Sequence, residues 1–350
     1  MPRSKTSHLH EMPSGSPVKK REAGLPRARI ISTGAYVPSK ILSNQDLERM
    51  VETSDEWITD RTGIKERRIA SSKEACSDLA YNAAKEALKT AGLKGRDLDL
   101  IIVATVTGDM PLPATACILQ DRLGATHAAA FDINAACSGF IFALATAEAF
   151  ISAGMHKRVL VVGSEVLSRA TDWEDRSTCV LFGDGAGAAI LAPAEGENGI
   201  ISIKLYSDGS KGDLLMVPGG GSRVPASDES LKKGLHYIKM KGNETFKFAV
   251  KTLEGLVHDM LEENGLNASS LALLIPHQAN MRIIKATAER IGLPMDKVVV
   301  NINKYGNTSA ASIPIALDEA VRYGRIKKGD YVLLEAFGGG LTWASALLKW

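Results

Sequence analysis

Short apolar runs alternate with Ala-rich stretches along most of the chain. From about Arg29 onward, the clearest apolar runs predict strands at 98–107, 158–166, 180–191, 271–276, 298–302 and 331–336. Stretches with apolar residues every three or four positions predict helices at 77–91, 138–153, 244–263, 281–291 and 309–323. Such alternation of strand and helix is typical of an α/β protein.

The second half of the sequence aligns with the first at the offset that places Asn307 on Asn134. At this offset 271–275 falls on 98–102, and 316–317 and 332–333 fall on 143–144 and 159–160. The helix predicted at 138–153 is apolar on nearly every side, which indicates that it is covered on all sides. We therefore predict a duplicated α/β unit, with two sheets, helices outside them and a shared pair of helices between them.

Charge is distributed unevenly along the chain. Up to Arg29 there are seven basic and two acidic side chains, a surplus of five positive charges, whereas the whole chain has a formal charge of only +2. The remainder is therefore slightly acidic, with a net charge of −3. We predict a disordered basic tail at 1–28, a first half at 29–195 and a second half at 196–350. An organelle transit peptide is the alternative for the tail, but Glu11 and Glu22 argue against it.

Composition excludes several classes of function. A slightly acidic body lacks the positive field that nucleic-acid binding requires. The N-terminal tail contains no apolar run long enough for a secretory signal or a membrane span. The four cysteines (Cys76, Cys117, Cys137 and Cys179) show no metal-ligand spacing, so no metal site is predicted and the compartment is expected to be reducing.

Cys137 is a candidate nucleophile because it directly precedes the apolar helix. A helix N-terminus favours the thiolate through its macrodipole and its free N–H groups. Judged by its position alone, Cys137 is more typical of a buried core residue than of a nucleophile. His277 changes this balance, because it follows a predicted strand at the edge where α/β proteins place reactive groups. Asn307 precedes the helix predicted at 309–323, which the repeat aligns with the helix that follows Cys137. An asparagine in such a place is ordinarily a helix cap.

Seven motifs together resemble the thiolase-like condensing enzymes, and most closely the β-ketoacyl-acyl-carrier-protein synthase III family. The resemblance runs from about Ala28 to Trp350. Its motifs are TSDEWI (53–58), RTGI (61–64), NAACSGF (134–140), FGDGAG (182–187), HQAN (277–280), GNTS (306–309) and FGGG (337–340). Asn307 separates this branch from elongating synthases, which use a second histidine.

The resemblance implies a five-layer αβαβα fold and a catalytic set of Cys137, His277 and Asn307. Cys137 would take an acyl group from an acyl-CoA, and thioester exchange is close to energy-neutral. His277 and Asn307 would stabilise the enolate formed when malonyl carrier protein loses carbon dioxide. The backbone N–H groups of Cys137 and Gly339 would hold the oxyanion. Taken alone, the glycines at 338–340 would predict only a hairpin turn.

The resemblance also implies binding residues for CoA and for the carrier protein. Trp57 and Arg176 would sandwich the adenine, with Arg61 and Asn243 nearby. Gln278, Arg282 and Lys247 would contact an acidic carrier protein. A basic patch could also include Lys285 and Arg290, although a solvated helix face is the ordinary interpretation, and the one we favour for Lys285.

Leu112 departs from many relatives, in which a phenylalanine reaches across the dimer interface and closes the partner's acyl pocket. The resemblance implies a cytoplasmic homodimer that requires no cofactor, because acyl-CoA and malonyl carrier protein are its substrates. The expected function is initiation of fatty-acid synthesis from acetyl-CoA or another short acyl-CoA. With leucine at position 112, it stays open whether the protein admits longer or branched primers.

Two alternative functions remain at this level, and a third is rejected. A secondary-metabolism relative would condense or transfer an acyl group onto another acceptor. A non-catalytic partner subunit would shape a carrier-protein complex, but such proteins usually lack the nucleophile. A nucleotide-binding oxidoreductase is rejected, because the glycines at 183, 185 and 187 have a displaced third position and continue as a strand.

Overall fold

The computed structural model describes residues 27–350. Almost all of the predicted tail lies outside the described residues. Its last position, Ala28, is already part of a strand, β1 (Ala28–Tyr36). The predicted boundary is therefore slightly late, because Ala28 is completely buried and pairs with Pro193.

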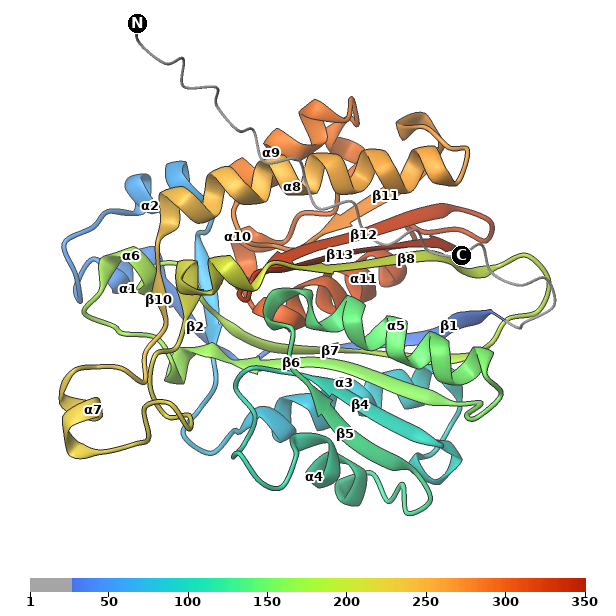
Figure 1. Ribbon diagram of the computed structural model, residues 1–350, viewed down its shortest axis with the longest axis horizontal. Coiled ribbons are helices and arrows are strands. Elements are labelled where there is room, and N and C mark those ends of the chain that lie inside the picture. Colours follow the sequence, from blue (N-terminus) through green and yellow to red (C-terminus); the bar gives the residue numbers. More distant parts are fainter. Residues whose placement is uncertain (1–26) are drawn as a thin grey trace, which may run out of the picture.

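The first half of the chain forms a five-stranded sheet with the strand order β1-β7-β6-β4-β5 (Figure 1). β1 and β6 pair antiparallel with β7, and β4 pairs parallel with both β6 and β5. The bounds are β4 (Leu100–Ala104), β5 (Ala129–Ile133), β6 (Val159–Val166) and β7 (Asp184–Pro193). β5 is an edge strand.

The second half repeats this arrangement in a four-stranded sheet with the order β8-β13-β12-β11. Two antiparallel pairings are again followed by one parallel pairing. The bounds are β8 (Gly199–Ser207), β11 (Leu271–Pro276), β12 (Tyr331–Gly338) and β13 (Thr342–Lys349). The predicted duplication is confirmed by this matching order.

Helices complete five layers (Figure 1). α5 (Gly139–Ser152) and α11 (Ser312–Arg322) lie between the two sheets, and the apolar core around them contains residues from both. α3 (Cys76–Ala91) and α4 (Thr115–Arg122) cover the outer face of the first sheet. α8 (Gly242–Glu263) and α9 (Met281–Arg290) cover the outer face of the second. The αβαβα fold is therefore confirmed, and burial on every side explains the apolar sequence of α5.

Shorter elements surround one end of the layers, where the chain connects sheets and helices. They are α1 (Asn44–Leu47), α2 (Asp55–Thr62), α6 (Arg176–Cys179), α7 (Asp228–Lys232), α10 (Ile302–Tyr305) and the two-stranded pairs β2 (Lys40–Ser43) with β3 (Glu66–Ile69) and β9 (Leu215–Met216) with β10 (Lys239–Met240).

Three predicted strands differ from the structure. The one predicted at 98–107 is shorter, since β4 spans only Leu100–Ala104. β7 starts at Asp184 rather than at Val180, because the preceding residues form a turn that brings Phe182 beside Asn307. The run 298–302 forms no strand and contributes a single bridge, from Val298 to Leu274. It occupies the place in the second half that β5 occupies in the first.

The repeat extends to unusual backbone geometry. Ala136 and Ser309 occupy equivalent positions of the two halves, and they are the two non-glycine residues with positive φ in the described chain, at 45° and 46°. Each follows an asparagine whose side-chain oxygen accepts its backbone N–H: Asn134 at 3.3 Å and Asn307 at 2.8 Å. Left-handed backbone is costly for residues with a side chain and concentrates at functional sites. Both turns are therefore candidate parts of a functional site.

Glu335 on β12 is completely buried and pairs across the sheet with Ser345 of β13. Neither of its carboxyl oxygens has a hydrogen-bond partner among the described residues. Burial raises the pKa of Glu335 from 4.5 to about 8. The folded protein therefore holds a proton on Glu335 at neutral pH, whereas the unfolded chain releases it.

We expect this proton to make the protein less stable as pH rises from about 4.5 to 8. In that range the unfolded chain binds fewer protons, so the free energy of unfolding falls by up to about 1.4 kcal/mol per pH unit from this group. The free energy of unfolding is measured with urea at pH 5 and pH 8, and Glu335→Gln should remove the part of the difference between them that Glu335 contributes. The exposed Glu195→Gln should retain it, and an unchanged slope in Glu335→Gln would contradict the assignment.

Candidate active site

Cys137 lies in the turn that joins β5 to α5. Ala136 with its positive φ precedes it, and a single 3-10 turn over Ala136–Ser138 leads into the helix at Gly139. The residue is buried, with 6% of its surface exposed. The turn aims the side chain away from the core between the sheets, since Cys137 lines two cavities.

His277 follows the last residue of β11 and keeps a strand-like contact, because its N–H donates to the Glu335 carbonyl at 2.7 Å. Its Nδ1 lies 2.6 Å from the Ser312 hydroxyl at the start of α11. Burial lowers the pKa of His277 from 6.5 to about 3. The imidazole is therefore neutral throughout the physiological range of pH.

Asn307 lies in the repeat-related turn before α11. Its N–H donates to the Leu181 carbonyl and its carbonyl accepts from Gly183, so the backbone is held on both sides. Its side-chain oxygen accepts the Ser309 N–H at 2.8 Å. The carboxamide is thereby oriented, and its Nδ2 donors have no partner among the described residues.

These three side chains line one cavity of about 100 Å³. Its remaining walls come mainly from α8, the start of α9 and the β12–β13 hairpin, including Phe246, Ile283 and Gly338. The predicted gathering of a thiol, an imidazole and a carboxamide is therefore present in the fold. It arises because both halves place a turn at the same end of the layers.

A second cavity of about 350 Å³ adjoins the sulfur from another side. Its lining is largely apolar and includes Val106, Leu167, Phe182, Leu215 and Ile238. Apolar walls suit a hydrocarbon group attached to Cys137, because burial of such a group removes apolar surface from water. Ser309 and Gly339 lie at the end near the sulfur.

Burial raises the pKa of the Cys137 thiol to about 11. The Ser309 hydroxyl and the N–H groups of Cys137 and Gly339 oppose this rise by hydrogen bonding to the sulfur. The expected preference for the thiolate is therefore wrong for the protein without substrate, because desolvation outweighs the donors.

The two N–H groups remain relevant to the chemistry. Gly339 lies in the connection between β12 and β13, so this glycine stretch is a hairpin as well as a wall of the site. The backbone must pass very close to the nucleophile here, since a side-chain carbon added at Gly338 would lie 2.6 Å from the Cys137 nitrogen. Two N–H donors beside the sulfur can stabilise the negative charge that develops on a carbonyl oxygen when its carbon becomes bonded to this sulfur.

Three of the expected CoA residues lie together, and two of the four adjoin residues that line the first cavity. The guanidinium carbons of Arg176 and Arg61 lie 4.9 and 5.1 Å from the centre of the Trp57 ring. Arg61 is linked to the cavity lining, because its carbonyl accepts from Asn280 at 3.0 Å. Asn243 is exposed beside Gly242 of the lining. A base cannot fit between Trp57 and Arg176 at this separation, so a sandwich requires Arg176 to move.

The expected carrier-protein residues divide into two groups. Arg282 and Lys247 are exposed, and Arg282 lies over the ring of Phe246, which lines the cavity. Gln278 is 1% exposed and bonds only to its own chain. The expected contact of Gln278 with a carrier protein is therefore wrong, because its side chain replaces backbone hydrogen bonds inside the fold.

Leu112 lies in the connection between β4 and α4 and is 85% exposed. It lines neither cavity beside Cys137. Within one protomer it therefore cannot limit the length of an acyl group.

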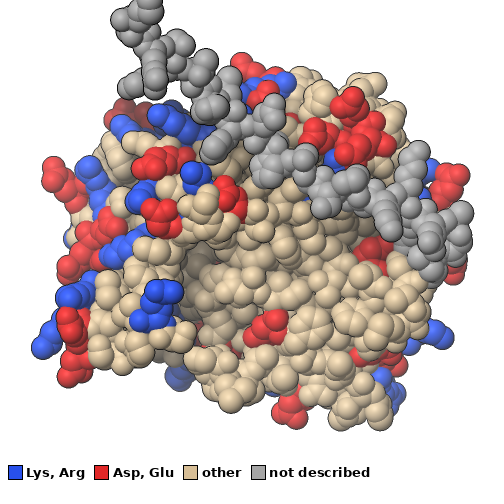
Figure 2. All heavy atoms as spheres, viewed as in Figure 1, with Lys and Arg blue, Asp and Glu red and all other residues tan. Residues whose placement is uncertain are grey.

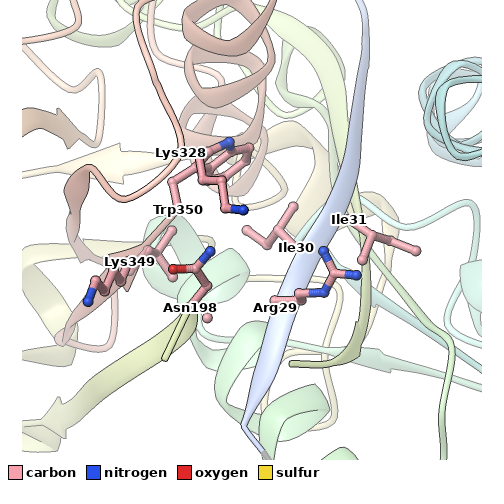
Figure 3. A pocket seen from close by; sticks show the side chains of 9 residues that line it. Arg29, Ile30, Ile31, Asn198, Lys328, Lys349 and Trp350 are labelled. Carbon is pink, nitrogen blue, oxygen red and sulfur yellow. The ribbon is translucent and has the colours of Figure 1, made fainter. Parts of the chain in front are cut away.

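A further cavity of about 360 Å³ (Figure 3) shares no lining residue with the two cavities beside Cys137. It is lined by Arg29, Asn198, Lys328 and Trp350 among others, and it contains no nucleophile or acid–base pair. Within residues 27–350, no three potential metal ligands of the His, Cys, Asp and Glu type come together. No helix in the same range combines the length and apolarity needed to cross a membrane.

Three residues at or near the site were not predicted from the sequence: Ser312, Ser309 and Glu165. Ser309 was visible as a member of the GNTS motif, but its contact with the nucleophile was not. Glu165 is buried at the end of β6, accepts from Thr107 at 2.5 Å, and has its pKa raised to about 7 by burial. Ser312 has one signal, since it is a polar residue at the start of an apolar helix where the repeat places Gly139.

Comparisons with known proteins agree with this geometry. The family model for 3-oxoacyl-[acyl-carrier-protein (ACP)] synthase III matches residues 131–209, and the model for its C-terminal part matches residues 261–350. The β-ketoacyl-[acyl-carrier-protein] synthase III of Caldanaerobacter subterraneus subsp. tengcongensis is 58% identical over 92% of this chain and 98% of its own. That of Xylella fastidiosa is 56% identical over the same shares.

Solved structures show the same likeness. The crystal structure of 3-oxoacyl-[acyl-carrier-protein] synthase III from Aquifex aeolicus has a TM-score of 0.86 and 52% identity, and it covers 92% of this chain and 100% of its own. Similarity at this level covers nearly all of both chains and extends through both halves of the fold. This chain belongs to the β-ketoacyl-[acyl-carrier-protein] synthase III family of condensing acyltransferases.

Proposed function

We propose that Cys137, His277 and Asn307 divide between them the reaction that initiates fatty-acid synthesis. The overall reaction transfers an acyl group from acetyl-CoA or another short acyl-CoA and condenses it with malonyl carrier protein. The products are 3-oxoacyl carrier protein, CoA and carbon dioxide. The observation that carries the division of roles is that the three side chains line one cavity although they come from three separate segments of the chain.

The first step is acyl transfer to Cys137. Its sulfur attacks the thioester carbonyl of the acyl-CoA, and the developing oxyanion accepts from the N–H groups of Cys137 and Gly339. The bond to the CoA sulfur breaks, and CoA leaves as the thiol with the proton that Cys137 gives up. One thioester replaces another, so the step needs no external energy. The apolar cavity of about 350 Å³ receives the acyl chain.

The second step is decarboxylation of the malonyl group. His277 and Asn307 donate hydrogen bonds to its thioester carbonyl, and the electron pair of the breaking carbon–carbon bond enters the enolate as carbon dioxide leaves. The carbanion attacks the acyl carbonyl on Cys137 and expels the sulfur as a thiolate, which takes up one proton from solvent and restores the thiol. Neutral donors in a buried site stabilise the enolate charge strongly, because little solvent competes with them. Loss of carbon dioxide drives the reaction, so the substrates themselves suffice and no cofactor is required.

The carrier protein would dock beside the cavity mouth. Arg282 and Lys247 are exposed there on α9 and α8, and both are cationic. An acidic partner is attracted by such a patch mainly during encounter. Arg290 is a weaker candidate, because it already pairs with Glu254.

A homodimer would form through the face that carries α5 and β5. Figure 2 shows that the centre of this face is largely free of charged side chains. β5 has one open edge, and Leu112, in the connection that follows β4 of the same sheet, is 85% exposed. Edge strands and exposed apolar side chains are common at protein interfaces. A protruding Leu112 would then reach the partner's acyl cavity.

Other functions are less well supported. Acyl transfer to another acceptor and a non-catalytic role both disagree with the names of the relatives at 56 to 58% identity. We propose a cytoplasmic location for the protein.

Intact-protein mass spectrometry tests this function directly. After incubation with a mixture of acyl-CoAs, we expect one acyl adduct per chain, whose mass identifies the preferred primer. Addition of malonyl carrier protein should remove the adduct and yield 3-oxoacyl carrier protein with one carbon dioxide. An adduct that persists with malonyl carrier protein but transfers to an amine or alcohol would favour a secondary-metabolism acyltransferase instead.

A further inference from the structure

The hydroxyl of Ser312 is the one side chain in the described protein that hydrogen-bonds to the His277 ring. Ser312 is the first residue of α11, is 2% exposed, and places its oxygen 2.6 Å from Nδ1. The other ring nitrogen, Nε2, has no protein partner among the described residues. Since the ring lines the cavity with Cys137 and Asn307, Nε2 is the nitrogen available to a substrate.

The surrounding bonds determine where the protons lie. The backbone N–H of Gln278 donates to the Ser312 oxygen at 3.4 Å, which uses one lone pair of the hydroxyl. Within residues 27–350, the hydroxyl proton has no hydrogen-bond acceptor other than His277 Nδ1. Ser312 therefore donates to Nδ1, and a neutral imidazole that accepts at Nδ1 carries its own proton on Nε2.

A serine at this position has a different effect from a carboxylate. A carboxylate would hold a proton on Nδ1 and favour the charged imidazolium, as outer partners of histidines often do. In the described part of the chain, the glutamate that contacts His277 is Glu335, and it does so through its backbone carbonyl. The hydroxyl keeps the ring neutral, and burial acts in the same direction by lowering the pKa of His277.

We propose that Ser312 is a positioning residue that holds His277 as the neutral Nε2–H tautomer, so that the ring can donate to the malonyl thioester carbonyl. The opposite tautomer would present a lone pair to that oxygen and repel it. This inference rests on the proposed role of His277 in decarboxylation. It adds the reason why a histidine without a carboxylate partner serves as the donor.

The tautomer can be measured without reference to activity. In protein labelled with ¹⁵N-histidine, the His277 signals are assigned by their loss in His277→Ala. We expect a protonated Nε2 and an unprotonated Nδ1 in the native protein, and a shift towards Nδ1–H or a mixture of tautomers in Ser312→Ala. A native Nδ1–H form, or an unchanged tautomer in Ser312→Ala, would overturn the proposal. The native measurement remains decisive even if the variant does not fold.

Kinetics supply the functional half of the test. Ser312→Ala should slow malonyl decarboxylation by roughly ten- to a hundredfold, as loss of an outer partner does elsewhere, while Cys137 acylation by acyl-CoA continues. Thr33→Val is the matched control, because it removes a buried 2.8 Å hydrogen bond to Asp318 on the same helix without contacting His277. Its decarboxylation rate should equal that of the native protein. An equal loss in both variants would reduce Ser312 to a structural role.

A double variant separates this proposal from the role of His277. If Ser312 acts through the ring, His277→Ala with Ser312→Ala should decarboxylate at the same rate as His277→Ala alone. A further loss in the double variant would refute action through His277. If His277→Ala alone retains the full rate, the proposed role of His277 fails, whereas the ¹⁵N measurement still judges the tautomer.

Discussion

Replacing Cys137 with serine is expected to abolish acyl transfer from acyl-CoA. The hydroxyl has nearly the same size, but it ionises far less readily than a thiol and forms an oxyester rather than a thioester. The lower nucleophilicity of the hydroxyl slows the transfer, and an oxyester, being more stable than a thioester, would also pass its acyl group on less readily. Removal of the covalent nucleophile costs other enzymes up to about 10⁶ in kcat.

The measurement is the mass of the intact protein after incubation with radiolabelled or unlabelled acyl-CoA. Cys117→Ser is a matched control, since Cys117 is exposed and lines neither cavity. The control should form the adduct at the native rate. Full acylation of Cys137→Ser would show that another group is the nucleophile.

His277→Ala and Asn307→Ala are each expected to slow release of carbon dioxide from malonyl carrier protein by about 10²- to 10³-fold, because each removes one donor from the developing enolate. Acylation of Cys137 should be at least partly retained, since its oxyanion accepts from the backbone instead. The two steps are followed separately, by adduct mass and by labelled carbon dioxide.

Asn264→Ala provides the control for a lost carboxamide. Asn264 bonds to the end of α8 at Met260 and lies away from the cavity lining. Its variant should release carbon dioxide at the native rate. If neither His277→Ala nor Asn307→Ala slows this release, the proposed enolate donors are wrong, even if Cys137 remains the nucleophile.

Local sequence predicted the architecture well because both halves repeat the same periodicities. The internal repeat of the sequence pairs the turns of Asn134 and Asn307, and the structure extends the match to the positive φ of Ala136 and Ser309. The apolar sequence of α5 predicted its place between the sheets for the same reason. A helix that is covered on all sides has apolar side chains on every face, because each face packs against apolar neighbours.

The run 298–302 is an exception, because hydrogen bonds from one distant side chain replace the strand that its local sequence predicts. Its β-branched residues are typical of a strand, yet the Gln278 carboxamide accepts from the backbone of Asn301 and Ile302 and donates to the Val299 carbonyl. These bonds satisfy backbone groups that a neighbouring strand would otherwise pair. The same contacts bury Gln278, so one long-range interaction accounts for two wrong predictions.

The sequence by itself determined the α/β class, the duplication, the family resemblance and the candidate nucleophile with its two helpers. These depend on periodicity and on motifs, which are local properties of the chain. Only the tertiary structure decided the protonation of the site, including the raised pKa of Cys137, the neutral His277 and its Ser312 partner. Desolvation and hydrogen bonding between distant segments control those properties, and both exist only once the layers have packed.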